Sequence, residues 1–167
     1  GPSRLNIGQG GSIASSTSAV VLTGDAITIG ANGIAVNTSG PLTIQPSSNN
    51  FTNALTFPIT NLSVANTITG LTIGKPNNTA GITIGSATAI NGPITLHGGA
   101  LTLNAALSTT NTSTGNMSLN GTTLSGGSLT VADGRTLTMN LSSNTNYSGT
   151  ITGTGLNFVK NGSGMLT

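Results

Sequence analysis

A motif of one apolar residue, one Thr and a second apolar residue recurs along this chain and restricts its fold more than any other feature. Successive side chains of a β-strand point to opposite faces, so each copy sends two apolar groups to one side and a hydroxyl to the other. The copies are Ile27-Thr28-Ile29, Leu42-Thr43-Ile44, Leu55-Thr56-Phe57, Leu71-Thr72-Ile73, Ile82-Thr83-Ile84, Ile94-Thr95-Leu96, Leu101-Thr102-Leu103, Leu129-Thr130-Val131 and Leu137-Thr138-Met139. Looser copies are Ile34-Ala35-Val36, Leu62-Ser63-Val64 and Met117-Ser118-Leu119.

The segments between these motifs are rich in residues that turn the chain. Asn-Gly and Gly-Gly pairs occur at Asn32-Gly33, Asn91-Gly92, Asn120-Gly121, Asn161-Gly162, Gly98-Gly99 and Gly126-Gly127. These residues tolerate the positive φ that sharp bends need. No segment shows a sustained helical period, and the helix formers Glu, Lys, Arg and Gln are scarce. The chain is therefore predicted to be all-β.

The spacing of the motifs distinguishes two all-β architectures. Motifs begin at residues 27, 34 and 42, then at 55 and 62, and later at 94 and 101. A step of seven or eight residues leaves about four residues between three-residue strands, which suits one corner of a triangular coil. An antiparallel sandwich is the alternative for many short strands. Its strands would be longer, typically about five or six residues, and its core would hold more aromatic residues.

The predicted fold is a right-handed parallel β-helix, or β-solenoid, with about 20–24 residues and three short strands per turn. About seven turns fit the chain, and at a strand spacing of roughly 4.8 Å they form a rod about 35 Å long. Ile, Leu, Val and Ala are expected to stack inside, and Thr outside. The polar, Gly- and Ser-rich residues 8–18 are expected to form a partial turn or a cap.

Charged residues are too few for several classes of function. They make up 4% of the chain, against about 25% in an ordinary soluble domain. The basic residues are Arg4, Lys75, Arg135 and Lys160. Each phosphate that a protein neutralises needs its own Lys or Arg, and four scattered cations form no patch. We therefore expect no nucleic-acid partner, despite a pI near 9.7.

The chain has the length of one domain and no run of the roughly 18 apolar residues that a membrane helix needs, so no membrane insertion is expected. Residues 1–3, Gly1-Pro2-Ser3, read as the scar of a removed expression tag. The chain stops at Thr167 inside what reads as another strand, so residues 4–167 are expected to be one segment of a longer repetitive protein. The absence of Cys fits an extracytoplasmic protein that does not depend on disulfides.

The C-terminal segment, residues 141–167, carries a family resemblance. It contains Asn146-Tyr147-Ser148-Gly149, then Gly153-Thr154-Gly155, Lys160 and Gly162-Ser163-Gly164. This order resembles the autotransporter-associated β-strand repeat of bacterial passenger domains. The earlier part of the chain, with phrases such as Gly70-Leu71-Thr72-Ile73-Gly74, is similar in composition to the repetitive body of filamentous-haemagglutinin-type exoproteins.

Both resemblances imply a right-handed β-helix that is exported to the bacterial cell surface or the medium. They also imply roles in adhesion, aggregation or biofilm formation, with host-cell or matrix glycans, matrix proteins or neighbouring bacterial cells as partners. Neither family carries catalytic residues that could be transferred to this chain. The expected function is that of a non-enzymatic adhesin segment, which acts either as a contact surface or as a rigid stalk.

An enzyme of the same fold is the main alternative. Glycoside hydrolysis usually needs two carboxylates, and the chain has only Asp25 and Asp133, each beside a glycine that indicates a turn. A polysaccharide lyase would need basic residues near acidic calcium ligands, and no such cluster is present. One imidazole, that of His97, cannot form a metal site or a triad by itself. We therefore predict no enzymatic activity, no catalytic or metal site and no cofactor.

The remaining singular residues are interpreted as structural. His97 precedes Gly98-Gly99 and is expected at a strand end or a turn. The few aromatic residues are expected to fill the core or its corners rather than to bind sugars; they are Phe51, Phe57, Tyr147 and Phe158. The sequence also contains Asn-x-Ser/Thr sites that follow from its composition, at Asn37, Asn61, Asn77 and Asn116 among others.

Ice binding is a second alternative, because regular Thr arrays on β-solenoids can order water. Such arrays usually carry two outward Thr per strand, in a Thr-x-Thr pattern. The motif here places one outward Thr between two inward apolar residues. A structural Thr ladder is the preferred interpretation, and thermal hysteresis would be needed to support ice binding.

Overall fold

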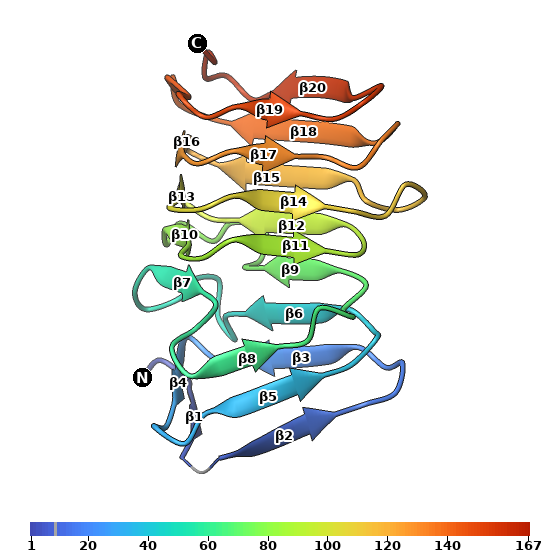
Figure 1. Cartoon of the computed structure of the whole chain (residues 1–167). Coiled ribbons are helices and arrows are strands. Elements are labelled where there is room, and N and C mark those ends of the chain that lie inside the picture. The colour runs from blue at the N-terminus through green and yellow to red at the C-terminus, as the bar shows by residue number, and fades with distance from the viewer. Residues whose placement is uncertain (9) are drawn as a thin grey trace.

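The computed structural model describes residues 1–8 and 10–167, and in this range the chain forms strands, turns and loops without a helix. The strands stack into a rod of about seven turns, and every strand pair is parallel (Figure 1). Followed from the N-terminus, the chain runs to the right along the front and to the left along the back, so the coil is right-handed (Figure 1). The predicted fold class is confirmed.

One face of the rod is a seven-stranded parallel sheet that runs its whole length. Its strands in spatial order are β3 (Val20–Thr23), β6 (Leu42–Gln45), β9 (Leu71–Ile73), β12 (Ile94–His97), β15 (Met117–Gly121), β18 (Thr136–Leu141) and β20 (Asn157–Asn161). Most turns have the predicted number of residues, which equals the separation of residues that pair in successive turns. Leu71 pairs with Ile94 and Ile94 with Met117, each 23 positions apart, and Met117 pairs with Leu137, 20 positions apart. The turn that runs from Leu42 to its partner Leu71 is longer than the others, and we call it the long turn.

The other two faces are each divided into an N-terminal and a C-terminal sheet. On the second face, the N-terminal sheet is β1 (Arg4–Ile7) with β4 (Ala26–Ile29), and the C-terminal sheet is β7 (Leu55–Phe57), β10 (Ile82–Ile84), β13 (Ala100–Leu103) and β16 (Thr123–Gly126). On the third face, the N-terminal sheet is β2 (Gly11–Ala14), β5 (Ile34–Asn37) and β8 (Leu62–Val64). Its C-terminal sheet is β11 (Thr88–Ile90), β14 (Leu107–Thr109), β17 (Leu129–Thr130) and β19 (Ile151–Thr152).

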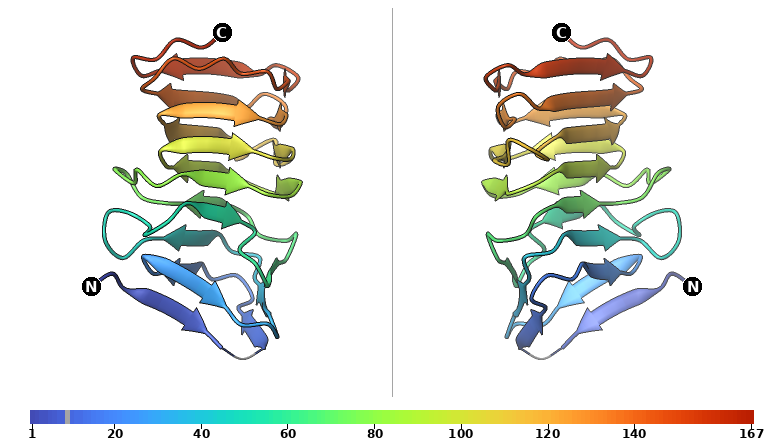
Figure 2. Two further views of the ribbon diagram at one scale, coloured as in Figure 1. Left: turned by 90° about the vertical axis from the view of Figure 1, so that its left-hand side faces the viewer. Right: turned by 90° about the vertical axis from the view of Figure 1, so that its right-hand side faces the viewer.

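The division falls within the long turn. There β6 stays in the continuous sheet. β7 pairs upward, toward the C-terminal end of the rod, with β10, whereas β8 pairs downward, toward the N-terminal end, with β5. The chain thus tilts as it crosses from the second face to the third. Each turn of the coil is one rung of the rod, and the rungs on the N-terminal side of the long turn are inclined to those on its C-terminal side (Figure 2). The predicted partial turn over residues 8–18 is also present, because β2 pairs with β5; Gln9 lies outside the described residues.

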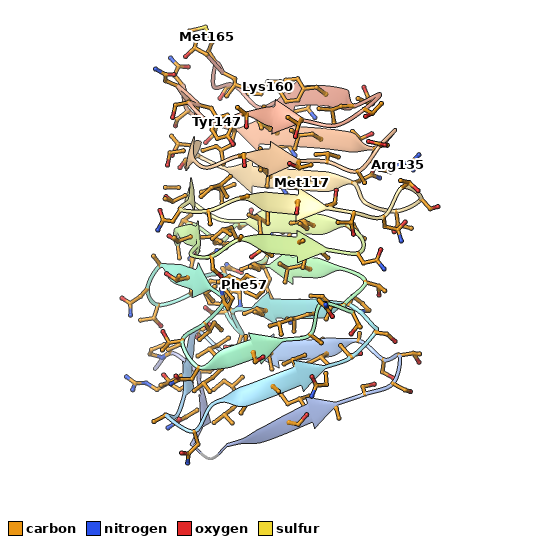
Figure 3. All side chains as sticks on the ribbon, viewed as in Figure 1. Phe57, Met117, Arg135, Tyr147, Lys160 and Met165 are labelled. Atoms are coloured by element: carbon orange, nitrogen blue, oxygen red, sulfur yellow. The ribbon has the colours of Figure 1, made fainter. Side chains whose placement is uncertain are left out.

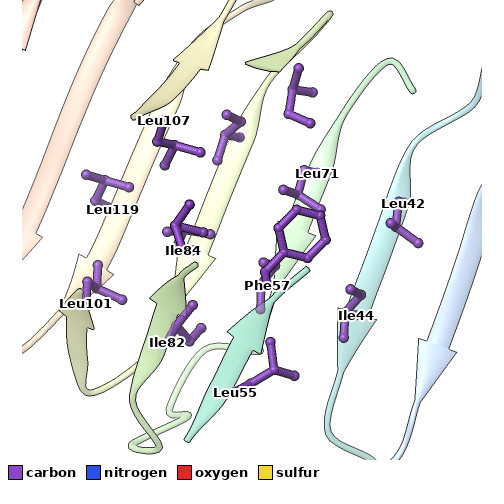
Figure 4. Close-up of a cluster of buried hydrophobic side chains, with 14 of the residues drawn as sticks. Leu42, Ile44, Leu55, Phe57, Leu71, Ile82, Ile84, Leu101, Leu107 and Leu119 are labelled. Atoms are coloured by element: carbon purple, nitrogen blue, oxygen red, sulfur yellow. The ribbon is translucent and has the colours of Figure 1, made fainter. Parts of the chain in front are cut away.

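The interior is filled by columns of aliphatic side chains, because the inward residues of each strand stack on the same positions of the next rung (Figures 3 and 4). One column of the continuous sheet is Leu42, Leu71, Ile94, Met117 and Leu137, and its neighbour is Ile44, Ile73, Leu96, Leu119 and Met139. Every residue of these two columns is at most 1% exposed, so burial of apolar area is the main favourable term for folding.

The hydroxyls of the recurring motif stack outside, as predicted. Thr43, Thr72, Thr95, Ser118 and Thr138 form one outward column on the continuous sheet. The next outward column includes His97, Asn120 and Asn140. Asn120 donates to the Leu96 carbonyl (3.0 Å) and Asn140 donates to Asn120 (2.5 Å), so amides also link successive rungs.

The glycine-rich pairs turn the chain for two different reasons. Gly33 and Gly162 have φ of 69° and 80°, as predicted for Asn-Gly turns. Gly92 is different, because a Cβ there would lie 1.9 Å from the Thr69 carbonyl oxygen of the rung below. Gly121 lies inside β15, where a Cβ would lie 2.6 Å from the Gly99 oxygen. At these two sites glycine is required by close approach of two rungs and not by positive φ.

Candidate functional site

A groove of about 280 Å³ opens where β4 and β7 separate on the second face. We call it the window. In the described part of the chain β4 pairs only with β1, and β7 pairs only with β10, so the two strand edges that face each other across the window lack a strand partner. The lower rim is residues 26–28, the upper rim is residues 53–56, and Phe51 and Ile59 also line the window.

Hydrogen bonds hold the window closed at both ends. At one end the Thr52 amide donates to the Asp25 carbonyl (2.7 Å). At the other end the Asn61 side-chain amide donates to the Ile29 carbonyl (3.2 Å). The opening is therefore a parting between two strands that are joined on either side of it.

Asp25 connects the window to the loop of residues 46–54. Its side chain is 4% exposed. One carboxylate oxygen accepts from the Ser3 amide (2.9 Å), and the other accepts from the Ser48 amide (2.8 Å) and the Ser47 hydroxyl (3.1 Å). These donors stabilise the ionised form, and the hydrogen bond from Ser48 contributes most, so the pKa of Asp25 lies well below its usual value. The sequence places Asp25 at a turn, which is correct, but does not reveal its burial.

Acid is expected to destabilise the N-terminal turns through Asp25. Because its pKa is lower in the folded chain than in the unfolded chain, its contribution to stability is present above the unfolded pKa of about 3.9 and is lost as the pH falls from there through the folded pKa. Thermal unfolding between about pH 2 and about pH 7 should show this loss for the wild type. Asp25→Asn should be less stable at neutral pH and should depend less on pH in the acid range.

Asp133→Asn is the matched control for this measurement. Asp133 lies in an exposed turn and accepts one hydrogen bond, from the Thr154 amide (3.2 Å). Its replacement should leave the acid dependence close to that of the wild type. An unchanged acid profile in Asp25→Asn would contradict the assigned role of Asp25.

Further along the rod, Lys75 and His97 line a shallow groove of about 240 Å³ that crosses four rungs. Lys75 donates to the Ser47 carbonyl (3.2 Å), so its ammonium group is held toward the 46–54 loop. His97 ends β12, as predicted for a strand-end residue, and partial burial lowers its pKa. Asn78 at the same groove donates to the His97 carbonyl (2.8 Å) and accepts from the Phe51 amide (3.3 Å), so it also holds the loop.

The other cations do not line these grooves, although Arg4 pairs with Ala26 of the lower rim. Arg4 is exposed on β1, and Arg135 donates to the Ser113 carbonyl (2.9 Å) at a corner of the coil. Lys160 takes a position in the inner column above Met139, and its ammonium group donates to the Asn161 carbonyl (2.5 Å). The four cations are therefore spread along the rod, as the sequence suggests.

The aromatic residues fill the core or its margins with one exception. Phe51 and Phe57 are 5% and 2% exposed, as predicted for core residues. Tyr147 is half-buried, its hydroxyl donates to the Gly127 carbonyl, and burial raises its pKa to about 12. Phe158 stacks above Leu137 but is 43% exposed, because within the described residues β20 pairs only with β18.

The Asn-x-Ser/Thr sites take structural positions. Asn37 donates to the Ser12 hydroxyl (3.0 Å), and Asn116 accepts from the Thr136 amide (3.0 Å). Asn61 and Asn77 adopt φ of 66° and 73°, which Asn tolerates better than most residues. Each of the four therefore has a role in a turn or between rungs.

Within residues 1–8 and 10–167, no three His, Cys, Asp or Glu side chains gather in a way that could hold a metal ion. The same range contains no helical segment with the length and hydropathy that crossing a membrane would require. Asp25 and Asp133 belong to separate turns of the rod, one on the second rung and one near the C-terminus, and each is hydrogen-bonded to backbone amides.

Sequence reasoning missed the window, although one signal for it exists. The motifs that begin at residues 42 and 55 are much farther apart than the usual step of seven or eight. The extra residues form the 46–54 loop, and β7 emerges from this loop already separated from β4. The step by itself did not single out this place, because the longer step from residue 101 to residue 117 leaves β12–β15, β13–β16 and β14–β17 paired.

Comparison with known proteins finds no matching family model, no matching curated sequence and no matching solved structure. The resemblance of residues 141–167 to the autotransporter-associated repeat therefore stays a prediction from the sequence.

Proposed function

We propose that this chain is a non-enzymatic segment of a secreted bacterial surface adhesin, which acts in adhesion or aggregation or as a rigid stalk. The observation that best supports the proposal is the continuous seven-stranded sheet. From β6 to β18 its outward side chains are neutral amides and hydroxyls, with His97 as their one titratable group. Such a face remains polar and unchanged in chemistry along most of the rod.

The direction of the hydrogen bonds suits a rigid spacer. Strand pairs are parallel and in register, so the ladder bonds between rungs run along the rod axis. The columns of buried aliphatic residues run in the same direction. Bending or stretching the rod would have to break both at once, and a surface protein that holds a contact site away from the cell needs this stiffness.

The polar face also suits contact with glycans, matrix proteins or neighbouring bacterial cells, which are the proposed partners. Scarcity of charge makes long-range electrostatic steering weak, so contacts would depend on hydrogen bonds and close fit. Because hydroxyl and amide groups recur on successive rungs, the same contacts can repeat along the rod.

The purified fragment should be tested for binding to glycans, matrix proteins, host cells and bacterial cells. Saturable binding would identify it as a contact surface, and uniform absence of binding together with rod-like rigidity would identify it as a stalk. Turnover of a polyuronate or another glycan would contradict the proposal and support the enzyme alternative. Thermal hysteresis would contradict it in favour of ice binding.

A further inference from the structure

We propose that the window between β4 and β7 binds one uncharged saccharide ring. The inference rests on the proposed adhesive function and names a ligand class and a site for it. Its basis is the chemistry of the opening: strand edges on two sides, polar rims above apolar side chains, closed ends and, among the described residues that line it, no cationic side chain.

The two rims supply hydrogen-bonding groups in the main chain. In the described residues, no backbone hydrogen bond joins residues 26–28 to residues 53–56 across the window. A strand edge without a partner presents amide donors and carbonyl acceptors. Outward side chains on both rims add to these groups, since Thr28 and Asn53 are both exposed. A ligand that carries donors and acceptors around its circumference can satisfy both rims at once.

Apolar side chains lie beneath the polar rims of the window. Ile27 and Ile59 are half-buried and pack against the core, and Leu55 is 8% exposed. A pyranose ring combines hydroxyls at its edge with C–H groups on its faces, so it complements polar rims above apolar side chains. Apolar surroundings with a few well-placed polar groups are typical of small-molecule sites.

The closed ends restrict the size of the ligand. The three residues of the lower rim span about 10 Å at about 3.3 Å per residue. An extended peptide that paired with β4 would have to continue past one of the closing hydrogen bonds, Thr52 to Asp25 or Asn61 to Ile29. A volume of about 280 Å³ also lies just below the range of sites for drug-sized ligands. One sugar ring fits these limits, and a strand does not.

The charge of the window favours a neutral sugar. Among the described residues, Asp25 is the one charged residue that lines it, and its pKa lies well below the usual value, so it is ionised at neutral pH. No Lys, Arg or His among the described residues lines the window. A sialic or uronic acid would bring its carboxylate near Asp25, whereas the two nearby cations are not lining residues: Arg4 lies on β1 beneath the lower rim, and Lys75 donates to the Ser47 carbonyl.

The test is a binding titration of the whole chain with neutral and acidic glycans, followed by ¹⁵N–¹H NMR spectra. Thr28 is an exposed residue of the lower rim, so the large side chain of Thr28→Trp should cover the window without entering the core. This variant should reduce affinity for a neutral glycan at least about tenfold, the equivalent of about 1.4 kcal/mol. Thr102→Trp is the matched control, because Thr102 is the outward Thr of β13, which is paired on both edges. It should leave the affinity unchanged.

In the wild type, neutral glycans should shift the amide signals of residues 26–28 and 53–56, and acidic glycans should bind more weakly. Equal loss of affinity in both Trp variants, or signal shifts confined to another face, would overturn the window as the site while leaving adhesion intact. Binding only to proteins or only to acidic glycans would overturn the saccharide class. Absence of binding to every glycan, protein and cell would overturn the window and leave only the stalk form of the proposed function.

Discussion

Gly126→Ala is expected to destabilise the C-terminal turns by about 3–5 kcal/mol. Gly126 ends β16 with φ of 98°, a conformation that is costly for a residue with a Cβ. A Cβ at this position would also lie 2.0 Å from the Leu103 carbonyl oxygen of the rung below. The strain cannot be relieved by a side-chain movement, because the obstructing atom belongs to the backbone, so the rungs must move apart.

Two other Gly→Ala variants separate these two causes. Gly134 has φ of 68° but open space around its missing Cβ, so Gly134→Ala should cost only about 1 kcal/mol. Gly11 has open space and no positive φ, so Gly11→Ala should change stability by less than about 0.5 kcal/mol. Urea unfolding followed by circular dichroism would rank the three variants. Similar values for all three would show that close approach of the rungs does not limit this fold.

Phe57→Ala is expected to cost about 3–5 kcal/mol. Phe57 is 2% exposed and lies in β7, where the chain leaves the 46–54 loop (Figure 4). Its ring also borders a second opening, between β8 and β11, so truncation would join a new cavity to an existing one. Few neighbouring strands could close this cavity, because β7 pairs only with β10 and β8 only with β5 in the described chain.

Phe158→Ala is the matched control for the Phe57 variant. It removes the same side chain from a position that is 43% exposed, and should cost less than about 1 kcal/mol. Hydrogen exchange should show where the Phe57 variant loosens: protection should fall first in β4, β7 and β8 and last in β12 and β15. A uniform loss of protection along the rod would indicate that the interrupted turn does not separate two cooperative units.

The repeated motif made the repeating part of the fold predictable. Its two-residue alternation assigned Leu42 and Ile44 to the interior and Thr43 to the exterior, and stacking of like on like then follows from parallel register. Spacing between motifs predicted the length of most turns, because the number of residues per turn is limited by three short strands and their corners. The scarcity of charged residues in the sequence likewise predicted that no cationic patch would form.

Contacts that depend on how one rung is stacked on another were not predictable in this way. Asp25 stands beside Gly24 like many turn residues, and its burial depends on Ser3 and Ser48, which are 22 and 23 positions away. In the sequence, Asn91-Gly92 reads as a turn that needs positive φ at the glycine. In the structure, glycine is required at this position because a Cβ would collide with the Thr69 carbonyl of the preceding turn. Both depend on which residue of one rung lies above which residue of another.

The sequence by itself therefore determined the alternation of inward and outward side chains, the presence of short strands and the approximate number of residues per turn. These properties follow from side-chain patterns over short stretches of the chain. Only the tertiary structure decided that β7 pairs upward and β8 downward, and so opened the window between β4 and β7. The physical reason is that a turn as long as the one from Leu42 to Leu71 can be accommodated by several stacking registers. The choice among them depends on contacts between distant rungs: Asp25 with Ser48, Asn78 with Phe51, and Asn61 with Ile29.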